Sequence, residues 1–459
     1  MTGVDQSWTS LLPASMREIL RGRLQLQKII SNIVWLSLDK VLRLGVGAVV
    51  GVWIARYLGP SEFGVLNYAA AFVVLFSPLS SLGLESILVR DILAEDEARR
   101  RHSLGTAFAM RCTGAIVGGL LACTMITFVR PGDSLVFTLV VIASAGLLLQ
   151  SFDVIDLWFH SQVRAKYGVY AKNTAFIILS GVRILLLVSH ARVTAFAWAM
   201  LAEIALGSAG LFIMYRRAGE QMARWRASFR RVGQFLRDSW PLAFANLAVI
   251  LYMRIGQVML GNIMGDKDVG IYSVATRLAE AWYFIPMSIA TSVFPSIVKA
   301  KRESPEIYRQ RLEAFYSLMS LISLGVATLT FLFSNTIITL LFGAQYAEAG
   351  PVLSIYIWAS IPVFLNIAST QFLIAENLTR VALYRTLAGA IANILLNIVL
   401  ISKYGPVGAA LATLLSYCVT LFCIGITSSL RNQIVMMLRS LNPFWAIKVL
   451  RRTSGGSAT

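Results

Sequence analysis

The chain has 459 residues, of which 57% are hydrophobic and 14% charged, and its formal net charge at pH 7 is +18. A soluble globular protein carries roughly 25% charged residues, so this composition excludes an ordinary soluble domain and indicates a helical protein with many membrane spans. The apolar segments are too long, and alternate too little, for a transmembrane β-barrel.

Apolar segments long enough to cross a bilayer follow one another from residue 30 to residue 428. The twelve predicted spans are 30–55, 63–89, 103–128, 134–157, 167–189, 193–215, 240–263, 269–298, 314–333, 350–374, 382–402 and 406–428. The predicted domains are a cytoplasmic N-terminal segment (1–29), an N-lobe of six spans (30–215), a basic cytoplasmic linker (216–239), a C-lobe of six spans (240–428) and a basic cytoplasmic tail (429–459).

Lysine and arginine are concentrated in every second connection between the spans. The remaining connections hold only Arg56, Arg130, Arg192, Lys267 and Lys403. The positive-inside rule therefore predicts that both termini are cytoplasmic, and it explains the basic surplus without nucleic acid as a partner. Contact with anionic lipid is a secondary consequence, since the linker tract ARWRASFRRVGQFLR predicts an amphipathic helix in the membrane interface.

The two halves of the chain share an internal repeat at a separation of 206 residues. LGPSEFGVLNYA in the first half aligns with MGDKDVGIYSVA in the second, which matches Gly59 with Gly265 and Gly64 with Gly270. Both stretches form the predicted external turn between the first two spans of a half, where glycine suits a tight turn. Because each half contains six spans, both halves cross the membrane in the same orientation. The repeat therefore predicts that the two lobes are related by an axis along the membrane normal. The predicted fold class is all-α and polytopic, with two pseudo-symmetric six-helix lobes around a central cavity, as in alternating-access transporters.

Charged residues inside the spans are the candidate functional residues, because a charge at the centre of a membrane helix costs at least ~2.5–3.5 kcal/mol. Four arginines lie at or outward of mid-depth by the helical rise per residue: Arg43, Arg183, Arg254 and Arg277. Three carboxylates lie near mid-depth or about one turn deeper: Asp39, Glu203 and Glu280. Arginine suits phosphate through its planar donor fork, so the arginines are candidate substrate-binding residues of a hydrated cationic cavity. The carboxylates are candidate counterions or coupling groups.

Ion pairing between helices is the structural alternative for some of these charges. Asp39 and Arg43 are four residues apart, and Arg277 and Glu280 are three apart, so each pair could neutralise itself. The other two arginines have no acid at helical spacing, which favours the cavity.

Asp153 and Asp156 lie near the cytoplasmic end of the fourth span, in LLLQSFDVIDLWFH. They are candidate gate or interface residues, and His160 is four residues from Asp156. No hydrolase or transferase constellation and no phosphate-binding GxxxxGK[ST] loop occurs, and the four cysteines lack zinc-like spacing. We therefore expect no enzymatic activity, no metal and no cofactor.

Five stretches in chain order resemble the Wzx-type polysaccharide biosynthesis flippases of the MOP exporter superfamily. They are WLSLDKVLRLGVGAVVGVWIARYLGPSEFG, QSFDVIDLWFHSQVRAKYGVYAK, VGIYSVATRLAEAWYFIP, LLFGAQYAEAGPVL and NILLNIVLISKYGPVGAALATLLSY. The resemblance covers about residues 30–428. It implies that undecaprenyl-diphosphate-linked oligosaccharide is flipped across the bacterial inner membrane for a surface polysaccharide such as O antigen or exopolysaccharide. It also implies that Arg43, Arg254 and Arg277 contact the diphosphate and anionic sugar, with a polysaccharide polymerase and other assembly proteins as candidate partners.

One departure from the family pattern bears on ion coupling. The family often carries aspartate where MRIGQVML has Gly256, so Asp39, Glu203 or Glu280 would have to serve instead. Two alternatives from the same superfamily stay open: a lipid II flippase, whose cavity would also be cationic, and a cation-coupled multidrug exporter, which would favour an acidic or aromatic pocket. A membrane glycosyltransferase would need a large external loop with catalytic carboxylates, and the connections here are too short for one.

Overall fold

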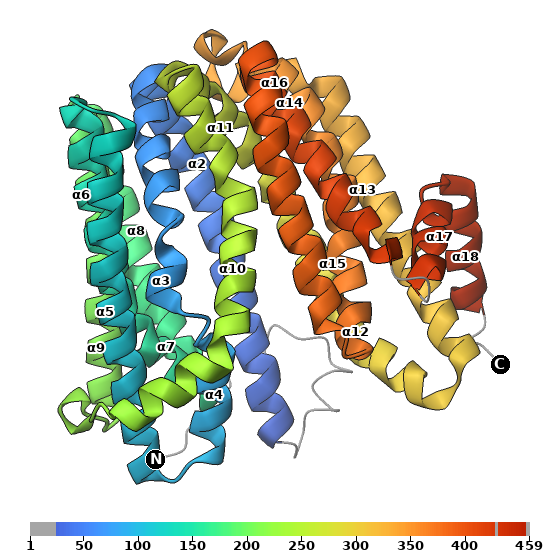
Figure 1. Cartoon of the computed structure of the whole chain (residues 1–459), viewed down its shortest axis with the longest axis horizontal. Coiled ribbons are helices and arrows are strands. Elements are labelled where there is room, and N and C mark those ends of the chain that lie inside the picture. Colours follow the sequence, from blue (N-terminus) through green and yellow to red (C-terminus); the bar gives the residue numbers. More distant parts are fainter. Residues whose placement is uncertain (1–23, 427–429, 456–459) are drawn as a thin grey trace. The chain divides into compact units, whose positions relative to one another are not determined.

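The computed structural model describes residues 24–426 and 430–455 (Figure 1). Within these ranges every regular element is a helix, which confirms the predicted all-α fold class. Parts of three predicted segments lie outside the described residues: 1–23 of the N-terminal segment, 427–428 of the last span, and 429 and 456–459 of the tail.

Among the described residues, ten continuous helical stretches are long and apolar enough to cross a membrane. They are α2 (Leu24–Val74), α5 (Glu97–Val129), α6 continued by α7 (Ser134–Leu149 and Asp153–Ser161), α8 (Lys166–Val188), α9 (Val193–Arg217), α10 (Phe229–Ile263), α11 continued by α12 (Asp266–Glu280 and Phe284–Glu303), α13 (Pro305–Phe342), α14 continued by α15 (Ala349–Tyr356 and Ser360–Ala375) and α16 (Thr379–Phe422).

Shorter elements lie between and after these stretches. The short α-helices are α3 (Ser77–Ser81), α4 (Glu85–Ala94), α17 (Arg431–Ser440) and α18 (Pro443–Gly455). The 3₁₀ turns are η2 (Gln150–Phe152), η3 (Met222–Arg224), η4 (Ala281–Tyr283), η5 (Ala344–Tyr346), η6 (Ile357–Ala359) and η7 (Cys423–Ile426).

Two of the long helices each contain two of the predicted spans. α2 covers the whole span 30–55 and the start of the next, and its backbone breaks at Gly59 (φ 69°, ψ 173°). α16 covers 382–402 and most of 406–428, and it breaks at Gly405 (φ 54°, ψ −132°). A proline follows each glycine, so both breaks combine a positive φ with a missing backbone donor. With these two breaks, the ten stretches correspond in order to the twelve predicted spans, except that the second span is only partly covered.

The prediction of one continuous span over 63–89 is wrong. The helix that begins this segment ends at Val74, and α3 and α4 follow as separate short helices. Leu82 (φ 50°) and Gly83 (φ 65°) place two left-handed residues between them, a common way to end a helix. A Cβ atom on Gly83 would lie 2.6 Å from the backbone nitrogen of Ala243, so α10 packs directly on this turn. Apolar composition does not reveal the break, because the segment 63–89 as a whole is largely apolar.

The chain divides into two compact units. Unit 1 consists of Met1–Ile54 and Phe76–Phe244, and unit 2 consists of Ala55–Leu75 and Ala245–Thr459. The second half of α2 therefore packs with the C-terminal helices, and α10 passes from one unit into the other. The lobe boundaries expected from the sequence stay a prediction.

Each unit has an apolar core of its own. In unit 1 Leu84, Leu88 and Phe159 are fully buried, and in unit 2 Tyr316 and Phe364 are fully buried. Many other large apolar side chains remain exposed along the long helices. Such an apolar outer surface suits a protein covered by lipid rather than water.

The matching turns of the repeat adopt the same uncommon backbone conformation. Gly59 has φ 69° and ψ 173°, and Gly265 has φ 107° and ψ 178°. Residues with side chains avoid this combination of positive φ and extended ψ, which is essentially restricted to glycine. Agreement at two positions 206 residues apart supports the internal repeat at the level of the backbone.

The second pair of repeat glycines makes a reciprocal contact inside unit 2. A Cβ atom on Gly64 would lie 1.8 Å from the carbonyl oxygen of Asp266, and one on Gly270 would lie 2.0 Å from that of Pro60. Pro60 and Asp266 are themselves 206 residues apart. The two turns therefore interlock symmetrically, and each needs glycine because the partner's backbone occupies the space of a side chain.

Candidate functional site

The charged residues predicted inside the N-terminal spans come together within unit 1. Asp39 and Arg43 lie on α2, Arg183 on α8 and Glu203 on α9. The Nε atom of Arg43 is 2.9 Å from Oδ1 of Asp39, and its Nη1 atom is 3.6 Å from Oε1 of Glu203. Nη2 of Arg183 donates to Oε2 of Glu203 at 2.7 Å. Two guanidinium groups thus share one carboxylate, and the four charges balance.

The exposure of these side chains indicates which of them a ligand can reach. The Arg183 side chain is 13% exposed and that of Glu203 20%, whereas Arg43 is 33% exposed. The Arg43 guanidinium also lies 5.2 Å from the ring centroid of Phe176, within the range of a cation–π contact. Charge-assisted hydrogen bonds are typically 2.7–2.9 Å long, so the 3.6 Å contact with Glu203 is the weaker of the two that Arg43 makes. An incoming anion could replace that contact without disturbing Arg183.

A second cluster lies within unit 2. Nη2 of Arg254, on α10, is 3.5 Å from Oε2 of Glu280, on α11. The hydroxyl of Tyr356, on α14, donates to the other oxygen of Glu280 at 3.2 Å. Arg277 is exposed, and its guanidinium lies 5.7 Å from the ring centroid of Phe63. Glu280 therefore accepts contacts from two neighbouring helices, one from a guanidinium group and one from a hydroxyl.

The expectation that Arg183 and Arg254 lack acidic partners is wrong. Glu203 pairs with Arg183, and Glu280 pairs with Arg254, each from a neighbouring helix. Sequence spacing detects partners on the same helix only. The predicted pairing of Asp39 with Arg43, four residues apart on α2, is confirmed.

The two candidate gate residues have a basic partner that the sequence analysis missed. Nζ of Lys172, on α8, is 2.9 Å from Oδ1 of Asp153 and 2.7 Å from Oδ2 of Asp156, both on α7. His160 lies 3.9 Å from the other oxygen of Asp156. A Cβ atom on Gly168 would lie 2.0 Å from that same oxygen, so a glycine there leaves room for the carboxylate. This arrangement fits an ion pair that joins α7 to α8. A role in gating stays a prediction.

Gly256, where the family often has an acid, lies beside buried amide groups. A Cβ atom there would lie 3.5 Å from Nδ2 of Asn397 and 3.8 Å from the hydroxyl of Tyr272, which is ordinary van der Waals distance. Asn397 is fully buried and donates to Oδ1 of Asn393 at 2.9 Å. The helix therefore has room for a small side chain at this position, but none is present.

Three residues of these clusters escaped sequence reasoning: Lys172, Phe176 and Tyr356. Lys172 lies near the start of a predicted span, within a stretch that resembles the flippase family. The two aspartates in the preceding segment were the available signal that a basic partner lies nearby. Phe176 and Tyr356 are ordinary apolar-segment residues, and only their positions in space bring them to Arg43 and Glu280.

Comparison with protein families yields two matches. The model of the family described as polysaccharide biosynthesis protein matches residues 29–301. The MatE family model matches residues 241–399.

Two curated relatives carry names of transport proteins. Over 398 residues the chain is 24% identical to the probable flippase AglR of Haloferax volcanii, a match covering 81% of this chain and 77% of that protein. It is also 24% identical over 340 residues to the succinoglycan biosynthesis transport protein ExoT of Rhizobium meliloti, covering 71% of this chain and 64% of that protein.

Solved structures share the fold. The lipid II flippase MurJ in an inward closed conformation superposes with a TM-score of 0.68 at 14% identity, over 92% of this chain and 95% of MurJ. An inward-facing multidrug resistance MATE family transporter of the MOP superfamily superposes with a TM-score of 0.67 at 14% identity, over 92% of this chain and 99% of that protein. At this identity the likeness concerns the fold alone.

Proposed function

Because the chain belongs to the polysaccharide biosynthesis protein family, we propose that it is a flippase that moves a lipid-linked oligosaccharide across a membrane by alternating access. It is a multi-pass membrane protein with helices suited to span a bilayer. The names of AglR, a probable flippase, and of ExoT, a transport protein of succinoglycan biosynthesis, support the same activity.

The observation that carries the proposal is the presence of arginines inside apolar helices of both units. A lipid-linked diphosphate must leave water as it crosses, and an ionised group in hydrocarbon is very costly unless it is paired. Arg43 in unit 1, and Arg254 and Arg277 in unit 2, have side chains exposed enough for a ligand to reach. Their planar donor forks match phosphate oxygens, so they would offset the desolvation of the diphosphate.

The carboxylates give each cluster a way to release its anion. Glu203 contacts Arg43 weakly at 3.6 Å, and Glu280 contacts Arg254 at 3.5 Å. When the substrate leaves, these carboxylates would re-pair with the arginines, so no bare cation would remain inside the helices. Asp39 would hold the Arg43 guanidinium in place throughout, since their contact is the shorter one.

We further propose the finer details that the family resemblance implies. The substrate would be an undecaprenyl-diphosphate-linked repeat unit, and the membrane would be the bacterial inner membrane with both termini in the cytoplasm. A polysaccharide polymerase would receive the flipped unit.

Flipping in reconstituted vesicles tests this function. The loss of polyprenyl-diphosphate oligosaccharide from the labelled leaflet would be followed for the wild type, Arg254→Ala and Arg277→Ala. We expect flipping by the wild type and at least a tenfold loss in Arg277→Ala, because a hydrogen bond to a charged group contributes about 1.5–3 kcal/mol. Arg99→Ala is the matched control, since that arginine is 73% exposed beside Asp96 and outside both clusters.

Three outcomes would contradict the proposal or part of it. Transfer that survives both substitutions would reduce the arginines to structural ion pairs. Transfer of lipid II but not of oligosaccharide lipids would favour the alternative flippase activity. Export of small organic cations without any lipid transfer would favour the multidrug alternative.

A further inference from the structure

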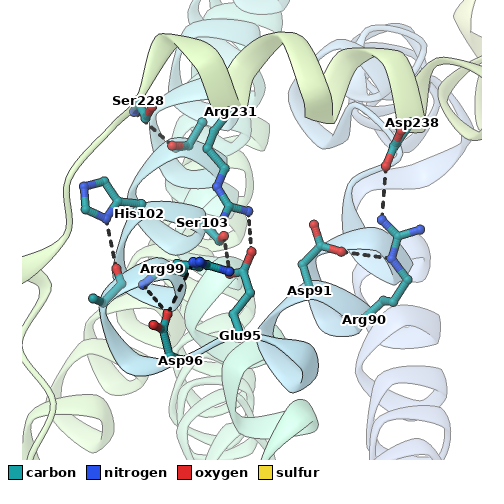
Figure 2. A network of polar contacts seen from close by, with 12 residues as sticks. Arg90, Asp91, Glu95, Asp96, Arg99, His102, Ser103, Ser228, Arg231 and Asp238 are labelled. Carbon is teal, nitrogen blue, oxygen red and sulfur yellow. Dashed lines mark hydrogen bonds and ion pairs between the residues drawn. The ribbon is translucent and has the colours of Figure 1, made fainter.

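The basic connector (residues 216–239), which precedes the long apolar part of α10, is fixed along one face to the rest of unit 1. In Figure 1 the first turns of α10 run across the lower ends of the long helices of unit 1, and Figure 2 shows the contacts. Arg231 forms an ion pair with Glu95, which also accepts a hydrogen bond from Ser103 at 2.6 Å. Further along, Nη2 of Arg90 is 3.1 Å from Oδ2 of Asp238.

The backbone just before α10 is also held against α5. The Ser228 amide donates to Oγ1 of Thr106 at 3.1 Å. A Cβ atom on Gly105 would lie 2.6 Å from the backbone nitrogen of Arg226, so the connector rests directly on α5. Because these contacts hold both the irregular segment before α10 and the first turns of the helix, the orientation of α10 around its own axis is set in this region.

That orientation leaves an apolar stripe uncovered. Phe235 and Ser239 are 1% exposed and face unit 1. At 100° per residue, Phe229, Leu236 and Trp240 fall on a shared stripe that points away from this contact. They are 98%, 46% and 57% exposed. A stripe with a fully exposed phenylalanine is unfavourable in water, which indicates that something else covers it.

Positive charges flank the stripe. Arg230 and Arg237 are seven residues apart and exposed, on the side next to the apolar residues. Within the described residues neither forms an ion pair, in contrast to Arg231 on the docked face. An apolar and aromatic stripe bordered by arginines is typical of helices that lie in the interface of a membrane containing anionic lipid.

We propose that this face of α10, formed by Phe229, Leu236 and Trp240 with Arg230 and Arg237, binds anionic phospholipid headgroups at the membrane surface. The apolar stripe enters the boundary between headgroups and acyl chains, and the two arginines pair with lipid phosphates. The inference needs only a membrane-spanning chain, so it stands or falls independently of the substrate that is flipped.

The test places a reporter on the proposed lipid-facing surface of the whole reconstituted protein. No atom lies within 4 Å of a Cβ at Gly233, which is on the exposed side between the stripe and the arginines. Gly233→Cys, in a chain whose four native cysteines are replaced by alanine, would carry a fluorophore. Its quenching would be compared between brominated phosphatidylglycerol and brominated phosphatidylcholine at equal mole fraction.

We expect the anionic lipid to quench several-fold more strongly, since each arginine near the surface favours anionic lipid by about fivefold. In Arg230→Gln with Arg237→Gln the preference should vanish. Lys299→Gln with Arg309→Gln is the matched control, because it removes the same charge from exposed lysine and arginine side chains that already pair with Glu303 and Glu313. This control should keep the preference.

Equal quenching by the two lipids in the labelled protein that keeps Arg230 and Arg237 would overturn the proposal. Quenching by neither lipid would place the face in water or against a soluble partner and would overturn it as well. If the double variant does not fold, a salt series on the parent protein decides the matter. The preference for anionic lipid should disappear at high salt, since screening shortens the reach of the arginines, and a preference unchanged by salt would contradict the pairing with phosphate.

Discussion

The two clusters inside the helices use the same residue types but differ in the length and exposure of their ionic contacts. In unit 1 two arginines meet two carboxylates, and the Arg183 to Glu203 contact is short and largely buried. In unit 2 the Arg254 to Glu280 contact is longer, 3.5 Å, and Arg277 is exposed. The unit 1 cluster is therefore better suited to join helices, and the unit 2 cluster to attract an anion. Each of the following substitutions would sharpen this contrast or remove it.

The largest expected effect is on stability, in unit 1. Glu203→Gln leaves Arg183 without its 2.7 Å partner, and removing one partner of a buried pair costs about 3 kcal/mol or more. Glu280→Gln should cost clearly less, because the Arg254 side chain is 32% exposed and its contact is longer. Thermal unfolding of both purified variants in the same detergent would measure the difference. Equal losses would mean that the two clusters are structurally equivalent.

The next effect is on transport, in unit 2. Arg277→Ala should lower the flipping rate at least tenfold with a small change in melting temperature, since a hydrogen bond from this arginine to phosphate contributes about 1.5–3 kcal/mol. The same substitution at Arg183 should instead lower the melting temperature, because Glu203 would keep only its 3.6 Å contact with Arg43. Flipping and unfolding measured on both variants would separate binding from stability. The contrast is refuted if Arg183→Ala is stable and inactive.

A smaller effect is expected at Arg43, the accessible member of unit 1. Arg43→Lys keeps the charge but loses the fork that holds Asp39 and stacks over Phe176. We expect a loss of about 1 kcal/mol, seen as a modest increase in the apparent Kd for a soluble diphosphate analogue. Arg43→Gln serves as the control that removes the charge. Wild-type affinity in Arg43→Lys, with weaker binding in Arg43→Gln, would show that geometry at Arg43 is irrelevant and charge alone acts.

The smallest effect concerns the ring beneath Arg277. Phe63→Leu removes the cation–π contact but keeps an apolar side chain, and at an exposed arginine this contact contributes about 0.5–1 kcal/mol. The flipping rate should fall by only a few-fold. Phe128→Leu, at an exposed ring outside the cluster, is the control. A loss as large as that of Arg277→Ala would assign the ring a direct part in substrate contact.

Much of the fold could be predicted because each span is a local property. A run of apolar residues must form its own backbone hydrogen bonds in lipid, so length and hydropathy are enough to locate most helices. The paired glycines at 59 and 265 were also visible in the sequence, and both have the positive φ that a tight turn requires. The segment 63–89 failed because helix ends inside an apolar run depend on a left-handed turn at Leu82 and Gly83, which composition does not reveal.

The sequence indicated which charged residues belong to the candidate site, but not which of them form ion pairs between helices. Asp39 and Arg43 share one helix, so their spacing sufficed to pair them. Glu203 and Arg183 lie on two helices, and Lys172 meets Asp153 and Asp156 across another pair. Spacing on a single helix does not report such contacts, since they depend on how each helix is rotated toward its neighbour.

Hydropathy and local patterns were enough to recognise a helical membrane protein, to locate most of its apolar helices and to find the charges inside them. Those features follow from hydropathy, charge distribution and local backbone preferences, which act within a few helical turns. The packing of the helices against one another brings Glu203 to Arg183 and Glu280 to Arg254, and it places Arg277 beside the ring of Phe63. It also decided which face of α10 rests on unit 1. These outcomes depend on helix rotation and packing, because a side chain's electrostatic environment is set by whichever neighbouring helix it faces.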